Sequence, residues 1–493
     1  MQWEGVQFWL NGNPRVQVGA NDQTLLDYLR HEGLTGTKEG CASGDCGACT
    51  VLIQDEVGGS HYPANACILP IQQLQHQGVL TVEGLANAEA LNPVQAALIE
   101  QHGSQCGFCT PGFVMAMAGW LSAQPEATLS DHALMAVNAN PIGKSAREAI
   151  SGNLCRCTGY RPILAAAYQA LAHPVENRRL PDSFGAGSDV TSSPQPEVVS
   201  ATAIGAFYRP ENLRSLEAIL RLEPGAILVA GGTDLMLEVT QKQSQFSCLV
   251  STARIDELKQ LEFFEDQAVI GAGVTLSTLK QIAESAWPQL GTFLSRLGSP
   301  QIRNRGTVGG NLGTASPIGD LLPIFLAMDA EVTVGDAEGN RRCIELSEFL
   351  TGYRQTQLGP GEYILSVRVQ GLEDFHRYYK VTKRQEDDIA TVGVSLRLKL
   401  DGDTIIRARI AVGGVAEKAC RLRAIEAQLE GVRLTPQLIE TIRAAVGSQI
   451  RPLSDVRASA AYRHVLTANL LARGLTAATG LETRSVFEVE PDA

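Results

Sequence analysis

The sequence has 493 residues, 44% hydrophobic and 19% charged, with a formal net charge of −12. This length exceeds what one hydrophobic core supports and predicts about three domains. An acidic chain lacks the basic surface that general nucleic-acid binding needs, so we expect no nucleic-acid partner. The sequence has no apolar run near the ~18 residues of a membrane helix and no signal-peptide pattern, which predicts a cytoplasmic protein without a membrane partner.

The eleven cysteines are unevenly distributed, because eight of them lie within residues 1–157. A large cytoplasmic chain is not expected to carry a disulfide framework, so this concentration predicts metal binding. The other three, Cys248, Cys343 and Cys420, are expected to be small buried hydrophobic residues.

The N-terminal region is expected to be a small β-rich unit. Segment 5–18 holds two strand-like runs joined by Asn-Gly-Asn, which predicts a β-hairpin. A short helix over 24–33 and strands over 49–54 and 78–85 follow.

From Asn92 the apolar spacing becomes helical. Pro lies just inside the start of the first helix and Gly at its end, and the segment 111–124 is apolar nearly all round, which predicts a buried helix. Four helices are expected, within 92–103, 111–124, 147–153 and 161–173.

Residues 174–202 are rich in Pro, Ser, Gly and charged residues and have no periodic apolar pattern. This composition predicts an interdomain linker. Mixed helix, strand and glycine-turn segments follow, and an α+β region begins near Tyr378. The expected fold is therefore a multidomain α+β architecture.

The first cysteine set has the spacing C-x4-C-x2-C in Cys41, Cys46 and Cys49, followed by Cys67. This spacing is typical of plant-type ferredoxins, in which four thiolates hold a [2Fe–2S] cluster. Glycines and alanines between the cysteines permit the tight loop that such convergence needs. A structural zinc site is the alternative, but it usually uses two C-x2-C pairs, and this set has one.

The second set combines C-x2-C in Cys106 and Cys109 with C-x-C in Cys155 and Cys157. Both pairs lie at breaks between predicted helices, and helix N-termini stabilise anionic thiolates. The spacing alone leaves zinc as an alternative. The position directly after the first set favours a second iron–sulfur cluster.

Together the two sets resemble the iron–sulfur region of the molybdenum hydroxylases, which include xanthine dehydrogenases, aldehyde oxidases and carbon monoxide dehydrogenases. The resemblance covers residues 4–173 and rests on the motifs CGFCTPG and NLCRCTGY. It implies a β-grasp ferredoxin-like [2Fe–2S] domain over 1–86 and a four-helix [2Fe–2S] domain over 87–173. It also implies that Gln105 contacts the pterin cofactor of a partner, although an ordinary polar helix end is the alternative.

Two glycine-rich stretches, 228–237 and 307–323, follow the predicted linker. Neither fits G-x-G-x-x-G, so a Rossmann dinucleotide site is not supported. Glycine turns after strands can cradle a diphosphate with backbone amides, and plain tight turns are the alternative.

In this context the two stretches resemble the family's FAD-binding domain of the PCMH-like type, expected over 203–374. The resemblance implies that FAD is bound by Leu228, Val229, Ala230, Gly231, Gly232, Thr233, Asp234, Leu297, Thr307, Gly309, Gly310, Asn311, Thr314, Asp320 and Lys380. Leu297 stands where some xanthine dehydrogenases have an aromatic residue, and Asp234 where many have Glu.

Segment 378–392 mixes basic and acidic side chains, which is typical of a solvated loop. It also resembles a xanthine dehydrogenase segment that passes close to the flavin. The resemblance implies that Lys380 contacts the flavin, and that Arg384, Asp387 and Asp388 shape its electrostatic field. Residues 375–485 resemble the family's CO dehydrogenase flavoprotein-like C-terminal domain.

The resemblance implies an NAD-dependent oxidoreductase, namely the electron-transfer subunit of a xanthine dehydrogenase that oxidises hypoxanthine and xanthine. Electrons would pass from a separate molybdopterin-binding large subunit through two [2Fe–2S] clusters to FAD and then to NAD. A dimer of heterodimers is implied, and catalytic residues are expected on the large subunit, so none is assigned here. The alternatives are the equivalent subunit of an aldehyde- or carbon monoxide-oxidising enzyme, a stand-alone iron–sulfur flavoprotein carrier, and a zinc-stapled structural protein.

Overall fold

The computed structural model describes residues 5–18, 22–86, 90–124, 141–184, 198–202 and 205–481. It divides into two compact units. Unit 1 contains the residues up to Asp256 together with 275–278 and 298–307, and unit 2 contains the other residues from Glu257 onward. The predicted boundaries after residues 86 and 202 and at 485 fall at residues outside the described ranges. Within these ranges no helix has the length and apolar composition needed to cross a membrane.

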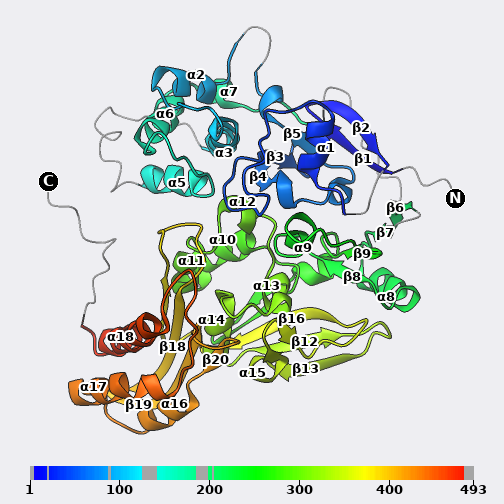
Figure 1. Cartoon of the computed structure of the whole chain (residues 1–493). Helices are drawn as coiled ribbons and strands as arrows, with labels where there is room; N and C mark the ends of the chain where they lie inside the picture. Colours follow the sequence, from blue (N-terminus) through cyan, green and yellow to red (C-terminus); the bar gives the residue numbers. More distant parts are fainter. Residues whose placement is uncertain are drawn as a thin grey trace. The chain divides into compact units, whose positions relative to one another are not determined.

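Unit 1 begins with a mixed β-sheet (Figure 1). Its strands are ordered β2-β1-β5-β3-β4 and comprise β1 (Val6–Leu10), β2 (Asn13–Gln17), β3 (Thr50–Gln54), β4 (His61–Asn65) and β5 (Gly78–Leu80). The predicted hairpin is confirmed, since β1 pairs with β2 in antiparallel register. Asn11 and Gly12 both have positive φ, as a tight two-residue hairpin turn requires. The predicted helix is α1 (Leu25–His31), whose Leu25, Leu26 and Leu29 are buried.

Helices overlap all four predicted segments of the next region, although the third, expected within 147–153, begins earlier and ends at Ile150. The four helices gather beside one another in Figure 1. They are α2 (Pro93–Glu100), α3 (Thr110–Ser122), α5 (Pro141–Ile150) and α6 (Arg161–Leu171). The Asn92 side chain caps α2, and Pro93 occupies its first turn. Helix α3 is buried over most of its length, as its apolar sequence predicts.

The predicted linker 174–202 contains the short helix α7 (Val175–Arg178) and strand β6 (Val198–Thr202), and its residues 185–197 lie outside the described ranges. Strand β6 belongs to a sheet of order β6-β7-β9-β8, with β7 (Gly205–Tyr208), β8 (Ile227–Val229) and β9 (Cys248–Ser251). Helices α8 (Leu213–Leu222), α9 (Met236–Thr240) and α12 (Pro300–Arg303) complete unit 1. Phe207, Val229 and Leu249 of this sheet share one hydrophobic core with the N-terminal sheet.

Unit 2 contains a sheet of order β10-β11-β16-β12-β13. Its strands are β10 (Leu261–Phe263), β11 (Gln267–Gly271), β12 (Glu331–Gly335), β13 (Arg341–Glu345) and β16 (Tyr363–Gln370). The accompanying helices are α10 (Leu276–Ala286), which belongs to this unit from Leu279, α11 (Pro288–Leu294), α13 (Val308–Thr314), α14 (Leu321–Ala327) and α15 (Leu346–Phe349). A small ribbon of β14 (Leu350–Gly352) and β15 (Gln355–Thr356) follows α15.

The expectation that the three scattered cysteines are buried is wrong for Cys343, which is exposed. Cys343 lies on β13, an edge strand with four of its five residues exposed. Cys248 is buried and Cys420 is half-buried. The position of Cys343 on an exposed edge strand therefore decides its exposure more than its residue type does.

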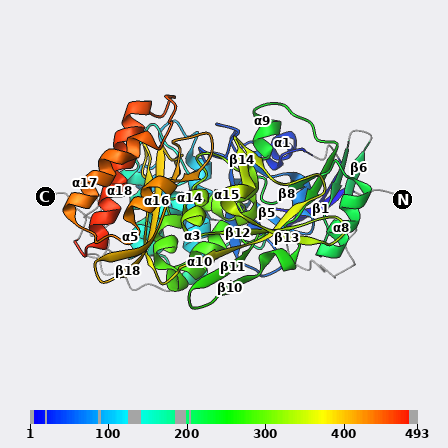
Figure 2. The ribbon, with the colours of Figure 1, turned by 90° about the horizontal axis from the view of Figure 1, so that it is seen from below.

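The C-terminal part of unit 2 is a sheet of order β17-β18-β19-β20 with three helices, which confirms the predicted α+β region. The strands are β17 (Phe375–Val381), β18 (Val392–Asp401), β19 (Thr404–Gly413) and β20 (Cys420–Arg421). Figure 2 shows α17 (Pro436–Ala445) and α18 (Ala460–Ala478) side by side, with α16 (Arg423–Leu429) near them. Their apolar faces and the sheet enclose one core.

A buried histidine on β17 is expected to make the stability of unit 2 dependent on pH. The Trp287 indole Nε1 donates to His376 Nε2 (3.2 Å), and His376 Nδ1 lies 2.9 Å from the Asp374 carbonyl. Burial lowers the pKa of His376 to about 4, below its ordinary value of 6.5. The unfolded chain therefore binds more protons than the folded chain between about pH 6.5 and pH 4, and stability falls as the pH falls through this window.

We expect the free energy of unfolding of the wild-type chain to fall by about 2 kcal/mol through this histidine when the pH is lowered from 7 to 5. A His376→Gln variant can still accept from Trp287 but does not titrate. Thermal unfolding of both proteins at the two pH values measures the effect. An equal loss of Tm on acidification in wild type and variant would contradict the assignment.

Candidate iron–sulfur and flavin sites

The first cysteine set converges in unit 1 from the loop between α1 and β3 and from the turn after β4. Cys41, Cys46 and Cys49 lie on the loop that leads into β3, and Cys67 lies in the 3-10 turn Ala66–Ile68 after β4. The Cys41 thiol is within hydrogen-bonding reach of the thiols of Cys46 and Cys67, and these contacts lower its pKa. The Cys49 thiol likewise neighbours that of Cys67. The structure thus brings together all four predicted ligands.

Small residues make this convergence possible. Gly44 and Gly47 have positive φ, and so does Ala42. A Cβ on Gly40 would lie 2.7 Å from Cys46 Sγ, so a side chain at this position would enter the space of the thiols. Asn65 Nδ2 closes the loop by donating to the Gly44 carbonyl (2.8 Å).

The second cysteine set forms at the ends of two helices. Cys109 is the N-cap of α3, and Cys155 and Cys157 precede α6. Cys157 Sγ lies 3.6 Å from Cys106 Sγ. Burial raises the pKa of Cys109 to about 12, with a further contribution from the thiol of Cys155. The second set therefore assembles from segments about fifty residues apart, as predicted.

The donor chemistry of both sets fits a binuclear cluster. A [2Fe–2S] cluster takes four thiolates on two irons, and each set supplies four cysteine thiols. Two thiolates on one tetrahedral metal with bonds of about 2.3 Å lie about 3.8 Å apart, close to the separation of Cys106 and Cys157.

Gln105 is exposed beside the second set, on the same segment as the exposed Cys106. Its exposure leaves it accessible to another molecule, and its contact with a pterin stays a prediction.

The first predicted FAD loop, 228–234, runs from the end of β8 toward α9 in unit 1. Gly231 and Gly232 are buried, and Gly232 has a φ of +79°. A Cβ on Gly231 would lie 1.9 Å from the Arg305 carbonyl oxygen, and one on Gly232 would lie 3.2 Å from the Ile68 carbonyl oxygen. The Gln73 side chain fixes the same loop by donating to the Ala230 carbonyl (2.7 Å).

A Gly231→Ala substitution is expected to displace this loop, because the new methyl group would meet backbone that cannot rotate away. Overpacking of this kind costs about 1–3 kcal/mol of stability, and we expect the purified variant to retain less FAD than wild type. The measurement is the ratio of FAD to protein after gel filtration, together with Tm. Gly225→Ala is the matched control, since a Cβ there meets nothing within 4 Å; equal losses in both variants would contradict the prediction.

The second glycine stretch supplies helix α13 in unit 2. Gly309 donates its backbone N–H to the Ala272 carbonyl (2.8 Å), and a Cβ on Gly309 would lie 2.5 Å from Ala272 Cβ. The side-chain oxygen Oδ1 of Asn311 is buried without a hydrogen-bond partner in the described part of the chain. A buried amide oxygen normally accepts a hydrogen bond, so Asn311 fits a position that faces a ligand donor.

A buried ion pair marks the third predicted part of the flavin site. Lys380 Nζ on β17 lies 2.6 Å from Asp320 Oδ2 at the start of α14, and their side chains are 2% and 12% exposed. Burial raises the pKa of Asp320, while Lys380 and Arg296 oppose this rise. Lys380 also donates to the Arg296 carbonyl (2.9 Å). The interpretation of 378–392 as a purely solvated loop is therefore wrong for Lys380.

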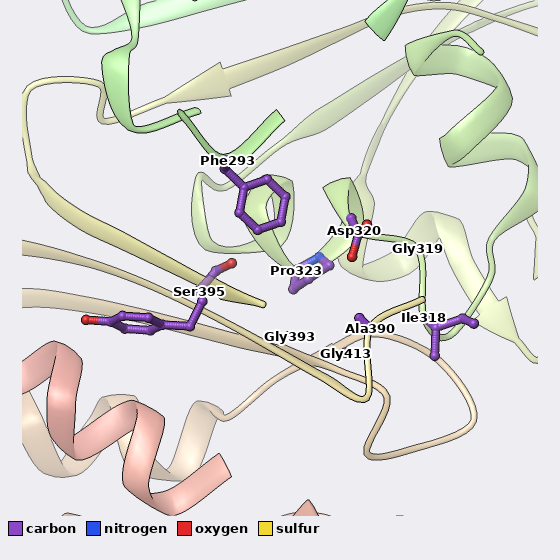
Figure 3. A pocket seen from close by; sticks show the side chains of 10 residues that line it. Phe293, Ile318, Gly319, Asp320, Pro323, Ala390, Gly393, Ser395 and Gly413 are labelled. Atoms are coloured by element: carbon purple, nitrogen blue, oxygen red, sulfur yellow. The ribbon is translucent and has the colours of Figure 1, made fainter. Parts of the chain in front are cut away.

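Asp320 lies at the edge of a pocket in unit 2 (Figure 3). The Phe293 ring, Pro323 and Ile318 provide apolar walls, and the backbone of Gly393 and Gly413 forms another side. An aromatic ring, an apolar wall and one buried carboxylate thus lie together around this small pocket.

Arg296, which no local sequence pattern marks, holds the charged loop after β17. Arg296 donates to the Lys380 carbonyl (3.0 Å), to Thr382 Oγ1 (3.2 Å) and to the Gln385 carbonyl (3.2 Å). Within the loop, Arg384 donates to the Asp387 carbonyl (2.8 Å) and pairs loosely with Asp388 (3.9 Å).

The remaining predicted residues lie close to these elements. Leu297 directly follows Arg296 and is 6% exposed. Thr307 in unit 1 forms an isolated bridge with Thr275, and Thr314 ends α13. No sequence signal singles out Arg296 or Phe293, although Ser299 and Pro300 do mark a helix start beside them.

Four family models match consecutive parts of the chain. They are described as "2Fe-2S iron-sulfur cluster binding domain" (residues 9–80), "[2Fe-2S] binding domain" (81–168), "FAD binding domain in molybdopterin dehydrogenase" (201–369) and "CO dehydrogenase flavoprotein C-terminal domain" (377–478). The chain is therefore an iron–sulfur flavoprotein, with two [2Fe–2S] domains and an FAD-binding domain.

Similarity to known proteins identifies the family of iron–sulfur flavoproteins to which this chain belongs. The chain is 32% identical to the xanthine dehydrogenase of Emericella nidulans over 88% of its own length, and 32% identical to that of Oryza sativa over 87%. It spans 36% of the length of each of these two relatives. These matches and the four domains place the chain in the molybdenum hydroxylase family, as its iron–sulfur and FAD-binding part.

A solved structure of a carbon monoxide dehydrogenase also resembles part of this chain. The carbon monoxide dehydrogenase of Hydrogenophaga pseudoflava, in a form that lacks the Mo-pyranopterin moiety, matches with a TM-score of 0.53 at 28% identity. The match covers 56% of this chain and 96% of the matched chain. The match supports the α+β fold over the part of the chain that it covers.

Proposed function

We propose that this chain is the electron-transfer part of a xanthine dehydrogenase. A molybdopterin-binding partner would oxidise hypoxanthine or xanthine, and this chain would carry the electrons to NAD. The curated relatives support this assignment because xanthine dehydrogenases match along nearly the whole chain, at 88% coverage for one of them. The assembly is proposed to be a dimer of heterodimers.

The observation that carries the proposal is the order of the sites within unit 1. The Leu154 N–H, next to Cys155 of the second set, donates to the carbonyl of Cys46 in the first set (3.0 Å). The first set in turn adjoins the FAD loop, since a Cβ on Gly232 would lie 3.2 Å from Ile68 O and from Pro70 Cδ, close after Cys67. Stepwise electron transfer needs such a series of neighbouring sites, here the second cysteine set, the first cysteine set and the FAD loop.

We assign the cofactors to the residues in the following way. The clusters are proposed to bind to the two cysteine sets described above. The backbone of Gly231–Thr233 is proposed to face the FAD diphosphate, and Asn311 and Asp320 are proposed to accept from the cofactor. When bound, the clusters supply one-electron transfer and FAD supplies the exchange between single electrons and hydride.

Lys380 would act beside the flavin by holding positive charge in a buried position. Its ammonium group is fixed by Asp320 and by the Arg296 carbonyl, so it cannot turn away toward solvent. The ammonium end of this ion pair favours negative charge that lies nearer to Lys380 than to Asp320.

A carbon monoxide-oxidising enzyme is the second candidate. The similarity to the Hydrogenophaga pseudoflava structure and the match to the CO dehydrogenase flavoprotein C-terminal domain support it. The substrate separates the two candidates, and it would bind to the molybdenum partner in either case.

Affinity purification of the tagged chain from its native host tests the proposal. We expect a molybdenum-containing partner to copurify, in a complex that oxidises xanthine with NAD as acceptor. A chain that elutes alone, with iron and FAD but no molybdenum partner, would support a stand-alone redox carrier instead.

A further inference from the structure

The backbones of three glycine-containing segments meet between the two cysteine sets in unit 1. A Cβ on Gly47 would lie 2.2 Å from the Gly152 carbonyl oxygen, and a Cβ on Gly112 would lie 2.2 Å from the Gly47 carbonyl oxygen. We call this contact of Cys46–Gly47, Gly112 and Gly152–Leu154 the cluster joint. Glycine permits this close approach, and any side chain would separate the two ligand loops.

Asn153 holds the cluster joint together from inside. Its Nδ2 donates to the Gly47 carbonyl (2.9 Å) and to Thr50 Oγ1 (3.3 Å), and Asn153 is 2% exposed. The Thr50 hydroxyl donates to the same carbonyl (2.6 Å). This network lies beside the hydrogen bond from Leu154 N–H to the Cys46 carbonyl.

Gln301 enters this network from helix α12, about 150 residues farther along the chain. Its Nε2 donates to Asn153 Oδ1 (3.0 Å) and to Thr50 Oγ1 (3.2 Å), and the residue is 1% exposed. Its Oε1 has no hydrogen-bond partner in the described ranges. A buried amide with an unsatisfied oxygen costs stability, so its placement here points to a role besides packing.

Helix α12 is anchored so that Gln301 cannot move independently. Ser299 caps the helix, and Arg303 pairs with Glu148 of α5 (2.5 Å) with its own side chain 3% exposed. Asn304 donates to the Pro63 carbonyl of β4 (3.0 Å). The segment thus contacts the ferredoxin-like sheet and the helical region at once.

We propose that Gln301 is a positioning residue for electron transfer between the two clusters. It orients Asn153 and thereby fixes the distance between the loops that carry Cys46 and Cys155. The transfer moves one electron from one reduced cluster to the other, and no bond forms or breaks and no proton moves. This inference rests on the proposed function, because it requires both clusters to be present.

The test compares wild type with Gln301→Met, which keeps the length of the side chain but removes both donated bonds. Gln54→Met is the matched control, since Gln54 is also buried and bonded, to Gly59 and Ser183, away from the cysteine loops. Hydrogen–deuterium exchange of the peptide around 152–155 and low-temperature EPR of the fully reduced protein are measured at equal iron content.

We expect Gln301→Met to lose protection at the Leu154 amide and to show a changed magnetic interaction between the reduced clusters, while Gln54→Met matches wild type. A variant with wild-type exchange, or with faster exchange and an unchanged EPR spectrum, would overturn the proposal. Gln301→Glu is measured in the same way if the Met variant does not assemble. Loss of iron from both Gln301→Met and Gln301→Glu would also overturn the proposal, because Gln301 would then be needed for assembly of the clusters. Wild-type protein without two clusters would contradict the proposed function instead.

Discussion

Replacing Cys155 by Ser is expected to lower the iron content of the purified chain from about four to about two atoms, because one of two [2Fe–2S] clusters loses a ligand. Cys155 neighbours the thiol of Cys109 in the second set and is not one of the four thiols of the first set. Iron analysis gives the stoichiometry. EPR of the reduced variant should show one of the two cluster signals of wild type.

The converse variant, Cys49→Ser, should remove the other signal. We expect it to be less stable, because Cys49 is 2% exposed and belongs to the hydrophobic core of the N-terminal sheet. Cys343→Ser is the control, since Cys343 is exposed on an edge strand and should leave the iron content unchanged. Retention of all the iron in Cys155→Ser would contradict the assignment of the second set.

Replacing Asp320 by Ala is expected to destabilise unit 2 by about 3–5 kcal/mol, because it leaves a buried lysine charge without its carboxylate. The Lys380 side chain is 2% exposed and cannot reach water without rearrangement. We also expect FAD to be lost from the purified protein. Denaturant unfolding of unit 2 and the ratio of FAD to protein measure the two effects separately.

The double variant Asp320→Ala with Lys380→Met should recover most of the stability but not the FAD, since it removes both charges together with the cofactor contacts. Glu362→Ala is the control for an ion pair near the surface. Its partner Arg342 is 43% exposed, and we expect a loss of roughly 0.2–1 kcal/mol. A double variant as unstable as the single one would contradict the account of a charge left unpaired.

Local sequence patterns predicted much of the fold. The hairpin at Asn11–Gly12, helix α1 and the four helices after Asn92 are each encoded within a few residues by turn chemistry, capping and apolar spacing. The two cysteine sets were also recognisable because ligand spacing within a loop is a short-range signal.

The parts that could not be predicted depend on contacts between distant segments. Gln301 meets Asn153 across 148 positions, and Lys380 meets Asp320 across 60. The residues that flank Lys380 in the sequence do not distinguish a buried lysine from a solvent-exposed one. The exposure of Cys343 likewise follows from the place of β13 at the edge of its sheet, which the local sequence does not encode.

Anaerobic addition of xanthine to the purified complex tests the central claim most directly. The account predicts that xanthine bleaches the visible absorption of both clusters and of FAD in this chain, that NAD restores it, and that carbon monoxide has no effect. Bleaching by carbon monoxide and not by xanthine would contradict the assignment to a xanthine dehydrogenase. An unchanged spectrum with either substrate, in a complex that contains molybdenum, would contradict the proposed role in electron transfer.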